Sequence, residues 1–213
     1  MNKTCEAFKV KQITRLYESC PQCGLPTLTC ICELISPLNT QAKFWIITSE
    51  REFYRPSSTG RLLKLLNPGS TEIFLWERTS PNLKLIENIR NYQGRTYLLF
   101  PALTEDLALR TASKIDAGEN AFILIDGTWK EAGRILRKSD YLSELPLVSL
   151  ETDYLSGFCL RRGGRQGTLC TIETAMEVLK INDEAEQEQG IRQYFNLFLK
   201  HYQAGASSHL PKE

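Results

Sequence analysis

Four short apolar segments, separated by stretches with helical periodicity, constrain the fold of this chain more than any other feature. They are rich in β-branched and aromatic residues and cover residues 43–48, 72–76, 96–100 and 121–125. Apolar runs of this length are typical of strands that are buried on both faces of a parallel sheet. Helical patterns cover residues 61–66, 104–115, 128–138 and 171–180. This alternation predicts an α/β fold with a mainly parallel sheet and flanking helices.

A long amphipathic helix is predicted near the C-terminal end, over residues 183–203. Its apolar side chains recur on one face of a 3.6-residue period: Ile191, Tyr194, Phe195, Phe198 and Tyr202. We interpret it as a structural helix that packs on the body of the protein. A chain of 213 residues can bury roughly two-thirds of its unfolded surface. We therefore expect one main domain over residues 43–213 and a small N-terminal segment over residues 1–42.

The N-terminal segment carries the one cluster of cysteines in the chain. Four of the seven cysteines lie close together among proline and glycine residues: Cys20, Cys23, Cys30 and Cys32. Four thiolates can supply the tetrahedral shell of a structural zinc ion. The alternative interpretation is a set of scattered structural thiols. We predict a zinc knuckle with four cysteine ligands and no core of its own.

The composition argues against a strongly basic, a membrane-spanning or a secreted protein. The 26 basic and 25 acidic side chains give a net charge of +1, so any affinity for RNA must come from local patches. No apolar run approaches the roughly 20 residues that cross a bilayer, and residues 1–7 lack the apolar stretch of a secretory signal. We expect a cytoplasmic protein without a membrane partner, in which reduced thiols favour metal binding over disulfides. The only histidines are His201 and His209, which argues against a histidine-centred catalytic triad.

The turn after residues 121–125 places an acid where α/β sheets bind their ligands, beyond the carboxyl ends of the strands. Asp126 is followed by Gly127, which permits a close approach of the backbone, and then by Thr128 and Trp129. The alternative interpretation is structural. Thr128 and Glu131 match a helix-capping box, and the tryptophan can belong to the core. From the residues alone, both interpretations stay open.

The helix that begins at this turn carries a basic stripe, formed by Lys130, Arg134 and Arg137 at i, i+4 and i+7. Ala132 and Ile135 belong to the opposite side. The stripe is suited to contact RNA phosphates, and a solvated helix face is the alternative.

Two further turns combine arginines with small residues. Residues 52–61 place small and hydroxyl side chains between Arg55 and Arg61, ahead of a helix whose first amides suit a phosphate or carboxylate. Residues 160–173 place three arginines in a glycine-rich loop before another helix, which suggests an anion site or an RNA clamp. A helix cap with solvated arginines and a flexible surface loop are the respective alternatives.

Together, these segments resemble the DTW-domain family, the tRNA-uridine aminocarboxypropyltransferases. The motif that names the family, an aspartate, a spacer, threonine and tryptophan, stands at residues 126–129. The family's R-x-S-N-T-G-R element corresponds to residues 55–61, with Ser58 where the family commonly has asparagine, and Ser49 stands where a histidine is frequent. The L-[SC]-T-x-E element corresponds to residues 169–173, and the cysteine knuckle also matches.

The resemblance implies a SPOUT-like fold whose C-terminal half forms a trefoil knot and binds S-adenosylmethionine. The expected donor-binding residues follow successive strands: Phe100, Pro101, Asp126, Gly127, Thr128, Trp129, Leu160, Arg161, Leu169, Cys170 and Thr171. The implied second substrate is tRNA. Its candidate contacts are Arg55, Ser57, Thr59, Gly60, Arg61, Lys130, Arg134, Arg161 and Glu173.

The reaction of the family transfers the 3-amino-3-carboxypropyl group of S-adenosylmethionine to N3 of a uridine and releases methylthioadenosine. Asp126 is the candidate catalytic residue, which either takes the N3 proton or positions the uracil. Trp129 either stacks on the base or supports the donor pocket. A SPOUT-type RNA methyltransferase and a non-enzymatic zinc-bearing RNA-binding adaptor are the alternative functions. A monomer and a homodimer both remain open.

Overall fold

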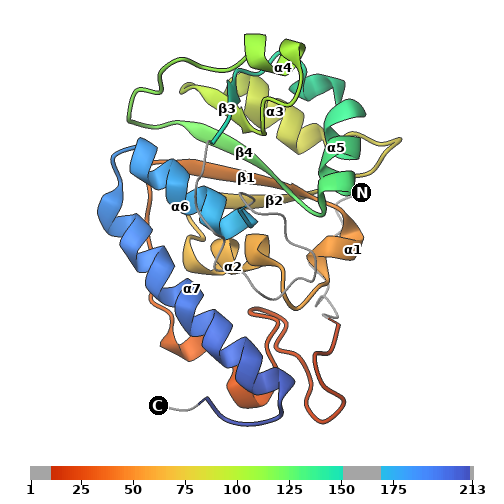
Figure 1. The fold of residues 1–213 in the computed structure, drawn as a ribbon, viewed down its shortest axis with the longest axis vertical. Helices are drawn as coiled ribbons and strands as arrows, with labels where there is room; N and C mark the ends of the chain where they lie inside the picture. Colours follow the sequence, from red (N-terminus) through yellow and green to blue (C-terminus); the bar gives the residue numbers. More distant parts are fainter. Residues whose placement is uncertain (1–10, 151–168, 212–213) are drawn as a thin grey trace.

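The computed structural model describes residues 11–150 and 169–211. Its centre is a sheet of five strands: β1 (Lys43–Thr48), β2 (Thr71–Leu75), β3 (Thr96–Leu99), β4 (Ala121–Asp126) and β5 (Leu147–Val148). They lie in the order β2-β1-β4-β3-β5, and every neighbouring pair is parallel. The predicted α/β fold with a parallel sheet is therefore confirmed (Figure 1).

Helices cover both faces of the sheet (Figure 1). On one face lie α2 (Thr59–Leu66), α6 (Thr171–Ile181) and α7 (Ala185–Ala206). On the other lie α3 (Leu83–Asn91) and α5 (Trp129–Arg137). The short elements are α1 (Glu50–Phe53), α4 (Glu105–Leu109) and the 3-10 turns η1 (Thr27–Thr29), η2 (Cys32–Leu34) and η3 (Asp140–Leu142). None of the helices in the described residues is long and apolar enough to span a bilayer.

The middle of β1 is apolar at successive positions because its side chains enter two different cores. Phe44 and Ile46 belong to the core that contains α2, α6 and α7. Trp45 and Ile47 belong to the core that contains α3 and α5. Successive side chains of a strand point to opposite faces, so the central residues of a strand between two helical layers are apolar on both faces.

The helix predicted over residues 104–115 is wrong in its length, because α4 ends at Leu109. The Arg110 guanidinium donates to the backbone carbonyls of Leu142 and Leu145, each at 2.7 Å, and the Ala112 amide donates to the Leu147 carbonyl at 2.8 Å. The Ala112 amide thus bonds to a distant segment in place of the preceding helical turn, and the Arg110 side chain is held at the same segment. The sequence pattern did not predict α3 or β5.

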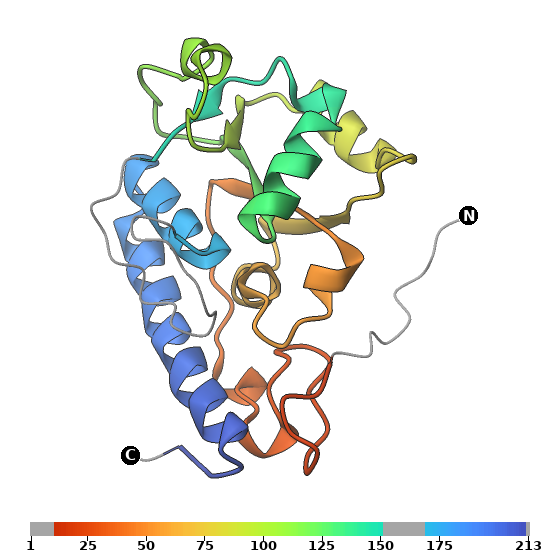
Figure 2. The same cartoon turned by 45° about the vertical axis from the view of Figure 1, so that its right-hand side comes forward.

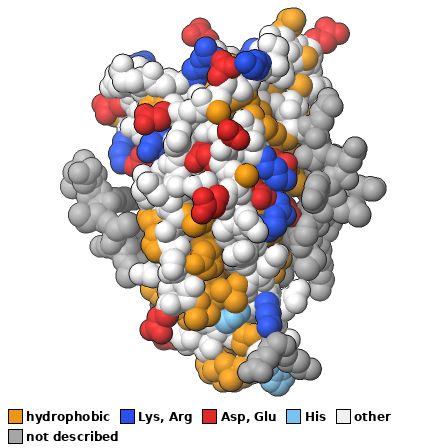
Figure 3. Space-filling model, turned by 90° about the vertical axis from the view of Figure 1, so that its left-hand side faces the viewer, with side chains coloured by type: hydrophobic (Ala, Val, Ile, Leu, Met, Phe, Trp, Pro, Cys, Tyr) orange, Lys and Arg blue, Asp and Glu red, His pale blue; other side chains and the backbone are white. Residues whose placement is uncertain are grey.

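The N-terminal segment packs directly against α7. Buried Cys23, Leu25 and Ile31 belong to the same core as the apolar face of α7. His201 Nδ1 lies 3.0 Å from the Thr29 carbonyl oxygen, and Figures 1 and 2 both show this segment beside the C-terminal end of the helix. Figure 3 shows apolar side chains gathered on the lower half of the side that α7 covers. The knuckle is thus fastened to the body of the protein.

Candidate functional site

Asp126 is the point at which three distant parts of the chain meet. It is the last residue of β4 and is only 2% exposed. Its Oδ1 accepts a hydrogen bond from the Thr171 hydroxyl at 2.6 Å, and its Oδ2 accepts one from the Ser58 hydroxyl at 3.2 Å. Thr171 is the first residue of α6, and Ser58 is the N-cap of α2. The carboxylate therefore joins the start of two helices to the end of a strand.

The starts of two helices lie against Asp126. Helix N-termini carry partial positive charge and stabilise nearby carboxylates. The Ser58 hydroxyl also accepts a hydrogen bond from the Arg61 amide at 3.3 Å, so one side chain serves both the helix cap and the carboxylate. A Cβ atom added at Gly60 would lie 3.0 Å from Asp126 Oδ2. The glycine thus allows α2 to approach the carboxylate closely.

The turn that follows Asp126 is fixed by the capping box that its sequence predicts. The Thr128 hydroxyl accepts a bond from the Glu131 amide at 3.3 Å, and Glu131 Oε2 accepts one from the Thr128 amide at 2.9 Å. Burial alone would raise the pKa of Glu131, but the bonds from Thr128 and the positive charges of Arg55 and Arg51 lower it. The two interpretations of this turn are compatible, because the box holds the turn that presents its neighbours.

Trp129 lies at the surface of this turn. Its side chain is 44% exposed, which excludes the interpretation of a core tryptophan. Its indole contacts the Phe100 ring edge-on, with the ring centroids 6.2 Å apart and an interplanar angle of 73°. Phe100 and the half-buried Pro101 follow β3. An exposed aromatic face therefore stands beside the carboxyl ends of β3 and β4.

The predicted anion-binding residues divide into exposed and buried groups. Lys130 and Arg134 are exposed on α5, with Arg137 beside them. Arg55 is partly exposed and its Nη1 lies 2.9 Å from Glu52 Oε2. These cations are accessible to a polyanion.

Other predicted contacts are used within the fold. Arg61 and Thr59 are buried, and buried Glu173 accepts a hydrogen bond from the Cys170 amide at 2.8 Å. Ser57, Leu169 and Cys170 are half-buried near the two helix starts. Leu160 and Arg161 lie outside the described residues.

Ser58 is a site residue that the sequence did not predict, although its neighbours Ser57 and Thr59 were predicted. The available signal was its N-cap position together with the asparagine that the family has there, since both side chains cap helices and donate hydrogen bonds. Ser58 is 2% exposed, which places it in the interior of the site.

The four cysteines form a second site with the geometry of a metal centre. Their sulfur atoms lie within 4.8 Å of one another, and the Sγ atoms of Cys20 and Cys32, and of Cys23 and Cys30, are 3.7 Å apart. Tetrahedral zinc with bonds of about 2.3 Å holds its sulfurs about 3.8 Å apart, whereas a disulfide requires about 2.05 Å. Burial raises the pKa of Cys23 to about 12, so its thiolate needs a nearby cation. The donor set fits a zinc ion.

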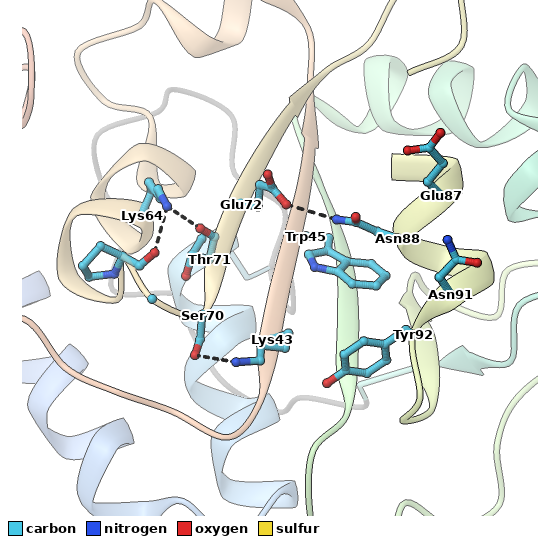
Figure 4. Close-up of a pocket in the computed structure, with 12 residues that line it drawn as sticks. Lys43, Trp45, Lys64, Ser70, Thr71, Glu72, Glu87, Asn88, Asn91 and Tyr92 are labelled. Atoms are coloured by element: carbon cyan, nitrogen blue, oxygen red, sulfur yellow. Dashed lines mark hydrogen bonds between the residues drawn. The ribbon is translucent and has the colours of Figure 1, made fainter. Parts of the chain in front are cut away.

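A separate cavity of about 600 Å³ lies at the opposite ends of the strands from Asp126. Figure 4 shows its lining at the amino ends of β1 and β2, with Lys43, Trp45, Lys64, Ser70, Glu72 and Tyr92 around it. Asp126 lies at the carboxyl end of β4, paired in register with Thr48. Because open parallel sheets bind ligands beyond the carboxyl ends of their strands, we place the candidate active site at Asp126.

The chain is similar to known proteins over most of its length. The model of the DTW domain matches residues 17–203, from the knuckle to α7. The chain is 27% identical over 201 residues to tRNA-uridine aminocarboxypropyltransferase 2 of Drosophila melanogaster, covering 91% of this chain and 79% of the relative. It is also 27% identical over 201 residues to the protein of the same name from Mus musculus, covering 91% and 67%. No solved structure shows significant similarity. The match over most of its length shows that the chain belongs to the DTW-domain family.

Proposed function

We propose that this protein transfers the 3-amino-3-carboxypropyl group from S-adenosylmethionine to N3 of a uridine in tRNA. The N3 lone pair attacks the γ-carbon of the donor, the bond between this carbon and sulfur breaks, and methylthioadenosine leaves as a neutral thioether. The proton of N3 leaves to solvent. The names of both relatives support tRNA and the transferred group.

The observation that carries the proposal is the convergence at Asp126. The elements of residues 55–61, 126–129 and 169–173 are far apart in sequence and share one carboxylate. A donor site at the carboxyl ends of β3 and β4 would bring together Phe100, Gly127 and the start of α6. The knotted, SPOUT-like arrangement that the resemblance implies, and the division into residues 1–42 and 43–213, remain part of this proposal.

We assign Asp126 a positioning role in preference to that of a general base. Both of its oxygens accept hydrogen bonds from side chains of the protein, and it is almost fully buried. A general base must reach the proton that it abstracts within about 2.6–3.2 Å, directly or through one water. A buried carboxylate that holds two helix starts instead fixes the geometry of the turn, which decides whether N3 faces the γ-carbon or the methyl group of the donor.

The tRNA side of the site would be the exposed face around Trp129. The indole offers a flat surface on which an unstacked base can lie. The basic stripe of α5 continues from this residue and is exposed, which suits phosphate contacts. The zinc ion would have a structural role, because four cysteines close its coordination shell and leave no open position for a substrate.

The test is a reaction with purified protein, tRNA and S-adenosylmethionine that is labelled either in the methyl group or in the carboxypropyl chain. We expect the label of the carboxypropyl chain in the RNA and the label of the methyl group in methylthioadenosine. Methyl label in the RNA would instead establish a methyltransferase. Absence of both labels from the RNA, together with no donor binding by calorimetry, would leave the adaptor function.

Asp126→Asn tests the role of the carboxylate, with 3-(3-amino-3-carboxypropyl)uridine measured by mass spectrometry of tRNA nucleosides. Asparagine still accepts one hydrogen bond and fills the same volume, so a positioning role predicts a slower reaction with measurable product. The expected loss in kcat is about tenfold to a hundredfold, within the range of a small misplacement of reacting groups. Undiminished product would exclude any role for the carboxylate.

A further inference from the structure

Arg61 is a buried cation that is held between the cysteine knuckle and the Asp126 site. It lies in the first turn of α2 and is 6% exposed. Its guanidinium closes the loop before α2 by donating to three backbone carbonyls, those of Arg55 at 2.7 Å and of Phe53 and Pro56 at 3.3 Å each. This loop leads directly into Ser58, which caps α2 and donates to Asp126. The conformation of the loop therefore depends on where the guanidinium lies.

The knuckle packs closely against the same guanidinium at Gly24. A Cβ atom added at Gly24 would lie 2.2 Å from Arg61 Nη2 and 2.9 Å from its Cζ. Gly24 also has a φ of +80°, a conformation that favours glycine. It directly follows Cys23, and its amide donates to the Cys20 carbonyl at 2.9 Å. The turn that carries two of the four sulfurs is thus in contact with the Arg61 side chain.

A metal site of four cysteines beside Arg61 would carry negative charge. Burial of the guanidinium disfavours its charged form and lowers the pKa of Arg61. Four thiolates with one divalent cation carry a net charge of −2, which remains after the metal has bound. An isolated buried charge is costly unless it is compensated. Arg61 Nε has no hydrogen-bond partner among the described residues, so compensation by nearby negative charge matters more.

We propose that Arg61 is a positioning residue that couples the metal site of the knuckle to the Asp126 site. The metal-thiolate cluster stabilises the buried guanidinium, and the guanidinium holds the loop that orients Ser58 and hence Asp126. The proposal rests on the proposed function only for its activity measurement. It replaces the prediction that Arg61 contacts the substrate, since every hydrogen bond that the structure gives its guanidinium is made to backbone carbonyls of one loop.

The first test measures zinc affinity by competition with a chromogenic chelator. Because the coupling between two charges is reciprocal, Arg61→Met is expected to weaken zinc binding tenfold or more. Arg61→Lys keeps the charge and is expected to stay within threefold of the native protein. The matched control is Lys64→Met on the same helix, which removes a cation that also donates to two carbonyls, those of Pro68 and Thr71. The control should leave the affinity unchanged.

The second test separates positioning from charge. A lysine side chain lacks the planar fork of arginine and cannot donate to all three carbonyls. The kcat of Arg61→Lys for uridine modification is therefore expected to fall at least tenfold, while its zinc affinity is retained. If the native protein has no transferase activity, the proposed function is refuted. The zinc titrations would still decide whether Arg61 is coupled to the metal site of the knuckle. Native zinc affinity in Arg61→Met, or native kcat in Arg61→Lys, would overturn the inference.

If Arg61→Met does not fold, hydrogen exchange of the native protein replaces it. Removal of the metal is expected to speed amide exchange in residues 53–61 while the amides of α3, on the far face of the sheet, stay protected. Unchanged exchange in residues 53–61 would overturn the coupling. Loss of protection in α3 as well would also overturn it, because the metal would then support the whole fold.

Discussion

The hydrogen bond from Thr171 to Asp126 offers the sharpest single test of the proposed site. Thr171→Val removes the hydroxyl that donates to Oδ1 at 2.6 Å and keeps the shape of the side chain. A hydrogen bond to a charged group contributes about 1.5–3 kcal/mol. For a domain of this size, 1 kcal/mol corresponds to about 2–4 °C in Tm. The expected loss is therefore about 3–12 °C, together with a slower uridine modification because the start of α6 loses its tie to β4.

The assay is thermal unfolding followed by circular dichroism, with activity measured on the same samples. Thr174→Val makes the same chemical change one turn later on α6, at a half-buried position, and is expected to change Tm by less than about 2 °C, as surface-type substitutions do. In a double-mutant cycle with Asp126→Asn, the two losses should not add, since both remove the same charged bond. Equal losses for both valine variants, or full additivity in the cycle, would refute the assignment of Asp126 as the buried tie between α6 and β4.

Three other predictions concern the surface and the knuckle. Trp129→Ala should weaken tRNA binding by about 1–3 kcal/mol, the usual contribution of base stacking. The affinity of Trp129→Phe for tRNA should lie between those of Trp129→Ala and the native protein. Native affinity in Trp129→Ala would show that Trp129 does not stack on a base. Replacing all three residues of the basic stripe by glutamine should make the plot of log binding constant against log salt concentration less steep, with a slope smaller by about two. Filter binding at several salt concentrations measures this slope. An unchanged slope would mean that the stripe stays solvated in the complex. Gly24→Ala should cost about 1–3 kcal/mol in stability because of its positive φ and the Arg61 guanidinium beside it, while Gly133→Ala in α5 should be neutral or stabilising by calorimetry; a stable Gly24→Ala protein would contradict the contact.

Local pattern was sufficient for the four longer strands, and it did not predict α3. The apolar runs predicted β1 to β4 to within a residue at each end, because the central residues of strands between two helical layers are mostly apolar. Pattern failed for β5, where two residues carry no period. It also failed for the end of α4, where Arg110 bonds to a segment more than thirty residues away.

The sequence by itself determined the class of fold, the cysteine cluster with metal-ligand spacing, and the capping box that shapes the turn after Asp126. These features are local, since they depend on residues a few positions apart. Only the tertiary structure decided that Asp126 is buried between Ser58 and Thr171, which lie 68 and 45 positions away. It also decided that Arg61 faces backbone carbonyls while Trp129 is exposed. The physical reason is that hydrophobic periodicity tells which face of an element is buried, whereas the partner of a buried polar group is chosen by which strand ends and helix starts the topology brings together.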